Sequence, residues 1–286
     1  MGRIAVVTDS AAALPVELVR RHNIHIIPIL LCWDNRTYRD GVDITPGEVY
    51  RRLRKAKSLP TTSAPSVGDF VRTYTRLGQE VDGIVSIHVS SDLSATFQAA
   101  RVAGEAVQGV VPVRLVDSGT AAMGQGFAAL AAARVALRGA DLEEVAREAE
   151  RVSRRTFVVA MLDTLEYLRR CGRAGRAVSL ATSALKIKPI LYLDGRGVNL
   201  LARPRTQRRA MQVMLQEMER RVNDRPVHVA VMHADAPAEA EQLRREVAAR
   251  FDCVELYVTE FTPVMGSAAG PGVVGLAFYS EDGGME

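Results

Sequence analysis

The first part of the chain alternates short apolar runs with stretches in which apolar residues recur at helical spacing. Strands are predicted at IAVVTD (4–9), within IHIIPILLCW (24–33), at DGIVSIHV (82–89) and at VPVRLVD (111–117). Helices are predicted at 10–22, 45–56, 66–78, 94–107 and 124–139. Ser10 and Thr45 stand where helix caps are expected, and Pro28 argues that its run is an edge strand or the start of a strand. Strands separated by helices pair in parallel, so the pattern predicts a layered α/β sheet.

The pattern changes after the polar segment DLEEVAREAERVSRRT (141–156). Strands are then expected at 156–163, 227–233, 254–261 and near the end of 266–280, with helices at 207–222 and from about residue 237. The stretch 188–206 is predicted to form a hairpin, because DGRG at Asp194–Gly197 suits its turn. We therefore expect two α/β domains, with a parallel sheet in residues 1–153 and a mixed sheet in residues 154–286.

Hydroxyl side chains gather at two places. HVSSDLSAT (88–96) lies where a predicted buried strand gives way to a helix, and PTTSAPS (60–66) is a loop bracketed by prolines. A serine at a helix start commonly caps it by accepting a backbone hydrogen bond. Hydroxyls and exposed N–H groups at the same junction could instead bind an anionic head group. The pattern alone leaves both interpretations open.

An internal echo links VVTDSAAAL near the start to LVDSGTAAM at 115–123. Each places an aspartate, Asp9 or Asp117, at the carboxyl end of a predicted parallel strand, where ligands of open α/β sheets bind. Asp-Ser is also ordinary turn and cap chemistry, which is the simpler interpretation.

Composition narrows the class of protein. Of the 286 residues 48% are hydrophobic and 24% are charged, which is typical of a globular chain with a sizeable core. No long uncharged apolar run predicts a membrane span, and the N-terminus lacks the apolar region of a signal peptide. Three scattered cysteines argue against a disulfide framework and fit a reducing cytoplasm. A net charge of +4 does not by itself indicate nucleic acid.

Several familiar motifs fail on context. GPGVVG (270–275) matches a dinucleotide fingerprint, but a strand follows it instead of a helix, and GQGFAA (124–129) starts seven residues after its strand ends. No Walker loop and no G-x-S-x-G elbow is present. The five histidines lack cysteines at ligand spacing, so no metal site is expected and each is interpreted as a satisfied or surface side chain.

Arginines and lysines cluster between residues 169 and 209. They are Arg169, Arg170, Arg173, Arg176, Lys186, Lys188, Arg203, Arg205, Arg208 and Arg209. Charged runs usually form a solvated face. Here glycine and hydroxyl residues interrupt them, which suits recognition of phosphate or carboxylate better.

Taken in order, these segments resemble the DegV family, bacterial fatty-acid-binding proteins that serve as FakB-type subunits of fatty acid kinase. The resemblance covers nearly the whole chain. It rests on IAVVTDSAAALP, PTTSAPS, SSDLSAT, LEYLRRCGRAGR, ALKIKPIL with DGRG, RPRT, HADAPAEAEQL and GSAAGPGVVGL. It implies two α/β domains with the acyl chain in a tunnel and the carboxylate near the domain interface. A separate kinase would phosphorylate the bound fatty acid, so this chain would be a carrier and not an enzyme.

The resemblance also implies the site. The residues that it assigns to the ligand are Thr61, Thr62, Ser63, Ser91, Ser94, Arg173 and Ala268. Arg203 and Arg205 would serve docking of the kinase. The expected ligand is a long-chain fatty acid such as palmitate, with no cofactor and no metal, in a cytoplasmic protein that can touch membranes transiently.

One departure from the family pattern concerns the head group. Where the family carries a histidine that contacts the carboxylate, this chain has Ala268 in GSAAGPG. Alanine cannot donate a hydrogen bond, so we expect Ala268→His to tighten fatty-acid binding. Ala95, where the family usually has glycine, is a milder change.

Two other functions compete with the carrier. One is an enzyme that uses Asp9, Asp117 and the arginines on a phosphorylated or carboxylated small molecule. The other is a nucleic-acid or regulatory binder acting through the arginines. The second is disfavoured because few aromatic residues stand beside those arginines to stack on bases.

Overall fold

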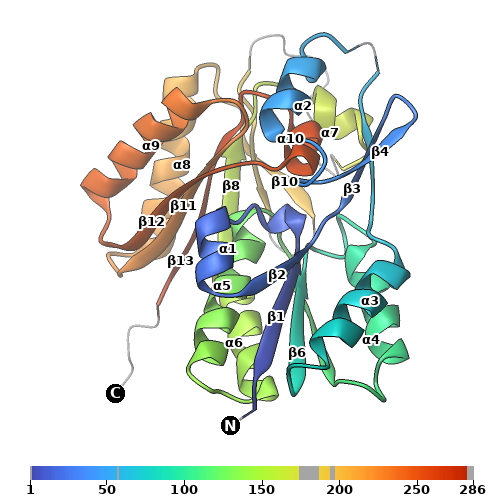
Figure 1. The fold of residues 1–286 in the computed structure, drawn as a ribbon. Coiled ribbons are helices and arrows are strands. Elements are labelled where there is room, and N and C mark those ends of the chain that lie inside the picture. The colour runs from blue at the N-terminus through green and yellow to red at the C-terminus, as the bar shows by residue number, and fades with distance from the viewer. Residues whose placement is uncertain (1, 57, 174–186, 194–196, 282–286) are drawn as a thin grey trace. The chain divides into compact units, whose positions relative to one another are not determined.

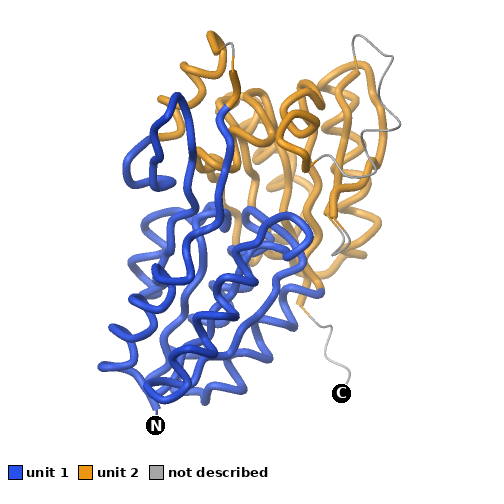
Figure 2. The backbone as a smooth tube through the Cα atoms, turned by 90° about the vertical axis from the view of Figure 1, so that its right-hand side faces the viewer, with its two compact units in different colours: residues 1–44, 60–154 blue, residues 45–59, 155–286 orange. Residues whose placement is uncertain are grey.

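The computed structural model describes residues 2–56, 58–173, 187–193 and 197–281. The chain forms two compact units, coloured separately in Figure 2. The first consists of Met1–Ile44 and Pro60–Arg154, and the second of Thr45–Leu59 and Arg155–Glu286. Residues 45–59 thus belong to the second unit by their contacts, although they stand within the first in sequence. That the chain has two separate domains, with a boundary between residues 153 and 154, remains a prediction.

The first unit is built on a parallel sheet with the strand order β2-β1-β6-β7. Its strands are β1 (Ile4–Asp9), β2 (Ile24–Ile27), β6 (Gly83–His88) and β7 (Val113–Asp117). Every residue of β6 is buried, as expected for a central strand covered on both faces. The predicted parallel α/β sheet is confirmed.

Helices cover both faces of this sheet (Figure 1). They are η1 (Ser10–Ala12), α1 (Val16–Arg21), α3 (Val67–Leu77), α4 (Thr96–Ala106), α5 (Met123–Leu137) and α6 (Leu142–Arg155). Phe70, Tyr74 and Leu77 of α3 pack with Val7 and Ile84 on one face. Helix α5 lies against the other and is buried without a break from Met123 to Ala133, which small alanine side chains allow. A β-carbon on Gly126 would stand 2.9 Å from the Ala12 carbonyl oxygen, so only glycine permits this approach.

Two predictions in the first unit are corrected by the structure. The run IHIIPILLCW forms two strands, because Pro28 interrupts it: β2 is an edge strand of the parallel sheet and β3 (Leu30–Trp33) lies in another sheet. That second sheet is antiparallel, with the order β4-β3-β5, where β4 is Arg36–Arg39 and β5 is Thr61–Ser63. Ser10 does not cap a helix; its Oγ accepts the N–H of Ile29 instead, and α1 starts only after Pro15.

The second unit contains a mixed sheet with the order β10-β9-β8-β13-β11-β12. Its strands are β8 (Phe157–Met161), β9 (Ile190–Leu193), β10 (Val198–Ala202), β11 (Val227–His233), β12 (Cys253–Glu260) and β13 (Val274–Ser280). Only β11 and β12 pair in parallel. Strands β9 and β10 pair as the predicted hairpin, whose turn at 194–196 lies outside the described residues.

Five helices complete the second unit. They are α2 (Pro46–Leu53), α7 (Glu166–Arg170), α8 (Gln207–Val222), α9 (Pro237–Arg250) and α10 (Pro263–Ala269) among the described residues. Methionines of α8 and aliphatic side chains of α9 form one core with the sheet. Helices α2, α7 and α10 pack together, and Figure 1 shows them gathered in one group. Tyr50 of α2 donates to the carbonyl of Phe261, which ties α2 to the start of α10.

Candidate hydroxyl site

The hydroxyls of PTTSAPS lie on strand β5. Consecutive side chains of a strand point to opposite faces, so Thr61 and Ser63 share one face and Thr62 has the other. Thr62 pairs with Leu31, which is fully buried, and is half-buried itself, whereas Thr61 and Ser63 are exposed. Ser63 Oγ donates to the neighbouring Ala64 carbonyl at 3.2 Å. Within the described part of the chain the hydroxyls of Thr61 and Thr62 make no hydrogen bond, so both are available to a ligand.

The second hydroxyl cluster forms a loop between β6 and α4. We call residues 90–94 the serine loop. Ser90 is buried, and its carbonyl accepts the N–H groups of Leu93 and Ser94, so the loop is a tight turn. Ser94 Oγ lies 2.8 Å from Thr96 Oγ1, and Ser91 is exposed. Ser91 Oγ has no hydrogen-bond partner among the described residues.

The backbone N–H groups of the serine loop already have acceptors inside the protein. The N–H of Ser90 donates to the Thr120 carbonyl, and that of Ser91 to the Asp117 carboxylate. The N–H groups of Asp92 and Thr96 donate to the hydroxyls of Ser90 and Ser94. These bonds occupy the hydroxyl of Ser90 and in part that of Ser94, although neither caps α4, whose N-cap residue Ala95 makes no side-chain hydrogen bond. The loop offers an anion hydroxyl groups, and these amides are not free to act as an anion cradle.

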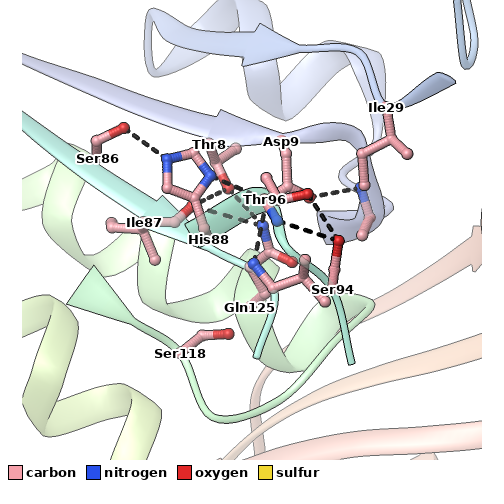
Figure 3. Close-up of polar contacts among 12 residues, drawn as sticks. Thr8, Asp9, Ile29, Ser86, Ile87, His88, Ser94, Thr96, Ser118 and Gln125 are labelled. Atoms are coloured by element: carbon pink, nitrogen blue, oxygen red, sulfur yellow. Dashed lines mark hydrogen bonds and ion pairs between the residues drawn. The ribbon is translucent and has the colours of Figure 1, made fainter. Parts of the chain in front are cut away.

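A fully buried polar chain joins α3, β6 and β1, and Figure 3 shows its members Ser86, His88 and Asp9. Tyr74 donates to Ser86 Oγ at 2.8 Å, Ser86 Oγ lies 2.7 Å from His88 Nε2, and His88 Nδ1 lies 2.9 Å from Asp9 Oδ2. Ser86 and His88 are two residues apart on β6, so their side chains lie on the same face of the sheet, the one that packs on α3. His88 is thus a satisfied core side chain, as the sequence analysis expected.

Burial determines the protonation state of Tyr74, at one end of this chain. Loss of water around Tyr74 raises the pKa of its phenol well above the ordinary value, and the hydrogen bond to Ser86 opposes this only in part. The phenol therefore keeps its proton and acts as a donor. When the Ser86 hydroxyl in turn donates to Nε2, His88 carries its proton on Nδ1 and donates to Asp9.

Ala268 and Arg173 lie in the second unit. Ala268 is half-buried in α10, and its carbonyl lies 4.0 Å from Cys171 Sγ. Arg173 donates from Nη1 to the Cys171 carbonyl at 2.9 Å. The turn at Cys171 therefore links the backbone of Ala268 to Arg173. Arg176 and Lys186 lie outside the described residues.

The predicted docking arginines lie just before the start of α8. Arg203 and Arg205 are both exposed, and within the described residues neither forms an ion pair. Thr206 between them and the helix caps α8 by accepting the N–H of Arg209. By contrast, Lys188 of the same predicted basic cluster is paired with Asp163 at 2.6 Å. The cluster is thus divided between a structural ion pair and solvated charges.

The described part of the chain shows neither a metal site nor a membrane span. The residues that the structure describes hold no group of three histidine, cysteine, aspartate or glutamate side chains arranged for a metal. No helix in that part of the chain is both long enough and apolar enough to cross a membrane. The three cysteines are free thiols.

The sequence pattern predicts where the hydroxyls lie but not which residues hold the loop that carries them. Asp9 and Asp117 were interpreted as turn formers, and each does accept an N–H of its own turn, from Ala11 and Gly119. Each also accepts an N–H from the segment that follows β6. The sequence sign of these bonds was the repeat of two strands that end in Asp-Ser. The repeat does not show that β6 lies between those two strands.

A family model, curated relatives and solved structures all match this chain to the same family. The sequence model of the DegV family matches residues 3–281, and its description is that of an uncharacterised protein of the DegV family. A DegV domain-containing protein of Streptomyces coelicolor is 38% identical over 279 residues, which is 97% of this chain and 98% of the relative. Protein DegV of Bacillus subtilis is 34% identical over 277 residues, covering 96% of this chain and 98% of its own.

Two solved structures are similar over almost the whole length. A DegV family protein from Thermus thermophilus, described for its fatty acid binding, has a TM-score of 0.93 at 34% identity and covers 98% of this chain and 100% of its own. DegV of Bacillus subtilis, described as a fatty acid binding protein, has a TM-score of 0.90 at 33% identity, with the same coverage.

Proposed function

This chain belongs to the DegV family, and on that premise we propose that it binds a long-chain fatty acid and presents it to a separate kinase. The observation that carries the proposal is the similarity over 98% of the chain to two proteins described as fatty acid binding. Their sequence identities to this chain, 34% and 33%, are higher than those at which two proteins share only a fold. The free hydroxyls on β5 and the serine loop support it independently.

We assign the carboxylate to the hydroxyls of Thr61, Thr62, Ser91 and Ser94. A carboxylate accepts hydrogen bonds only, so hydroxyls that still have a proton to donate suit it. Each such charge-assisted bond contributes about 1.5–3 kcal/mol. The exposed Ser63, the half-buried Arg173 and Ala268 complete the proposed set.

The tail would supply most of the affinity. About 14 methylene groups at ~0.8 kcal/mol each give a gross term near ~11 kcal/mol before the costs of binding. The head-group bonds would then set orientation and discriminate acids from other lipids. No cofactor is part of the proposal, and phosphoryl transfer would belong to the partner kinase in the cytoplasm.

The direct test is to denature the purified protein, extract it with organic solvent and identify released lipid by mass spectrometry. A fatty acid at close to one equivalent supports the carrier function and names the preferred tail. A protein that is empty and also fails to bind added palmitate contradicts it.

Kinase coupling needs a second test. With a purified fatty acid kinase subunit, ATP and palmitate, the protein should support acyl phosphate formation. Arg205→Ala should lower that rate while leaving the affinity for palmitate unchanged, since Arg205 is exposed and unpaired among the described residues. Arg138→Ala, on an exposed turn of the first unit, is the matched control. Equal rates for all three proteins would exclude this docking role.

A further inference from the structure

The serine loop is held from both sides by two aspartates. In the sheet order β2-β1-β6-β7, strand β6 lies between β1, which ends at Asp9, and β7, which ends at Asp117. Asp9 Oδ2 accepts the N–H of Val89, immediately before the loop, at 3.0 Å. Asp117 accepts the N–H of Ser91 at 3.2 Å. Each flanking strand thus anchors one residue of the segment that follows β6.

Asp9 is built for this task. Its side chain is fully buried, and its two oxygens accept from Ala11 N, His88 Nδ1 and Val89 N at 2.9–3.0 Å. A carboxylate taken out of water is tolerated only when such donors replace the lost hydration. Three converging groups do this, and His88 donates from Nδ1 to Asp9 when Ser86, which accepts from Tyr74, donates to Nε2.

Asp117 is less buried and acts more locally. It is half-buried, pairs in register with His88, and accepts the N–H of Gly119 at 2.9 Å as well as that of Ser91. The same carboxylate therefore shapes its own turn and holds the backbone of a residue that offers a free hydroxyl.

We infer that Asp9 and Asp117 are positioning residues, which hold the backbone of the serine loop so that Ser91 and Ser94 can bind a carboxylate. This inference rests on the proposed fatty-acid binding and deepens it. Neither aspartate binds the anion, because like charges repel. Both act by taking up amide groups, which leaves hydroxyls as the donors of the loop. Their effect is therefore on recognition of the head group and not of the tail.

The test compares two ligands with one tail, palmitate and 1-hexadecanol, by titration calorimetry. Asp9→Asn and Asp117→Asn keep the shape of the side chain but put an NH2 group against backbone N–H donors. Each should weaken palmitate binding at least ten-fold and change hexadecanol binding less than two-fold. Thr8→Val is the control and should change neither affinity, because it removes the buried bonds of the Thr8 hydroxyl to the Ile87 carbonyl and from Gln125 but none of the bonds to Asp9.

Rescue separates positioning from simple destabilisation. His88→Asn keeps an N–H donor near Asp9 and should retain most of the preference for palmitate, whereas His88→Ala should lose it. Equal weakening of both ligands by the aspartate variants, or unchanged palmitate binding in folded protein, would overturn the inference.

A readout without lipid keeps the two proposals distinguishable. Amide hydrogen exchange at residues 89–94 should become faster in Asp117→Asn, which is half-buried and less prone to unfold than the Asp9 variant. Wild-type protein that binds neither ligand would contradict the proposed function, and unchanged exchange would contradict the positioning role.

Discussion

The ring of Tyr50 occupies the space where a β-carbon on Gly266 would stand. Such an atom would lie 2.5 Å from Tyr50 Cε1 and closer still to the hydroxyl. Tyr50 is fully buried and its hydroxyl donates to the Phe261 carbonyl, so the ring cannot easily move aside. Helices α2 and α10 therefore pack at a distance that only glycine allows.

Gly266→Ala should consequently destabilise the protein by about 1–3 kcal/mol, the usual cost of overpacking a core. Urea denaturation measures this as a shift in midpoint. Gly109→Ala is the control, since a β-carbon there meets nothing within 4 Å. Adding Tyr50→Leu to Gly266→Ala should recover part of the loss. A Gly266→Ala midpoint equal to that of wild type would show that α10 can move away from α2.

The capping box of α3 makes a second prediction, which depends on pH. Ser66 Oγ accepts the N–H of Asp69, and Asp69 accepts from the N–H and hydroxyl of Ser66. These bonds to Ser66 are the main reason why the pKa of Asp69 is lowered. A lowered pKa stabilises the fold above the unfolded value, and the stabilisation is lost as the pH falls through the folded value.

Ser66→Ala should therefore cost about 1 kcal/mol at pH 7 and less at pH 2.5. Chemical denaturation at the two pH values gives the difference directly. Ser58→Ala, at another exposed serine, should have no effect at either pH. A cost that does not change between the two pH values would rule out the ionised Asp69 as the source.

Tyr74 makes the opposite prediction, at alkaline pH. Burial raises the pKa of its phenol, so the folded state holds this proton more tightly than the unfolded chain does. The resulting stabilisation is complete below the unfolded pKa of about 10 and is lost as the pH rises above it. Tyr74→Phe has no such proton to lose. Its free energy of unfolding should fall less steeply between pH 9.5 and 11 than that of wild type.

The control for this slope is Phe70→Leu, which loosens the same core as Tyr74 but removes no ionisable group. It should keep the wild-type dependence on pH. If Tyr74→Phe follows the wild-type curve as well, the buried phenol is not what limits alkaline stability.

Ala268→His adds a hydrogen-bond donor at a position that we assign to the head group. Ala268 is half-buried, so part of its surface is open to a larger side chain. One added charge-assisted bond of about 1.5 kcal/mol corresponds to roughly ten-fold tighter binding of palmitate. Calorimetry measures it, with the adjacent and equally half-buried Ala269→His as control. Tightening by Ala269→His alone would move the head-group contact by one residue.

Periodicity was enough to predict most strands of the parallel sheet and of the mixed sheet, but not the antiparallel sheet β4-β3-β5. The apolar runs at 4–9, 83–88 and 113–117 became strands of a parallel sheet because the helices between them return the chain in one direction. The predicted cap at Thr45 was also confirmed, since Thr45 is the N-cap of α2 and its N–H and hydroxyl both donate to Glu48. These features depend on neighbours in sequence, which a pattern can display.

What the sequence did not predict depends on residues far apart in the chain. Ser10 has the side chain of a cap, but its Oγ bonds Ile29, and nothing in the ten residues around Ser10 announces this. Helix α10 carries small residues without helical periodicity, and its packing partner Tyr50 lies more than 200 residues earlier. The bonds from the serine loop to Asp9 and Asp117 likewise need the strand order before they can be inferred.

The placement of residues 45–59 in the second unit has a consequence for synthesis of the protein. Tyr50 leaves the ribosome 211 residues before Phe261, an interval of roughly 10–40 s at ~5–20 residues per second. Strands β3 and β5 on either side of the segment can pair early and let the first unit close around its own sheet. During that interval α10 has not been synthesised, so the apolar face of α2, formed by Val49, Tyr50 and Leu53, lacks the helix on which it packs. This face is an apolar surface on the nascent chain that a chaperone would have to shield.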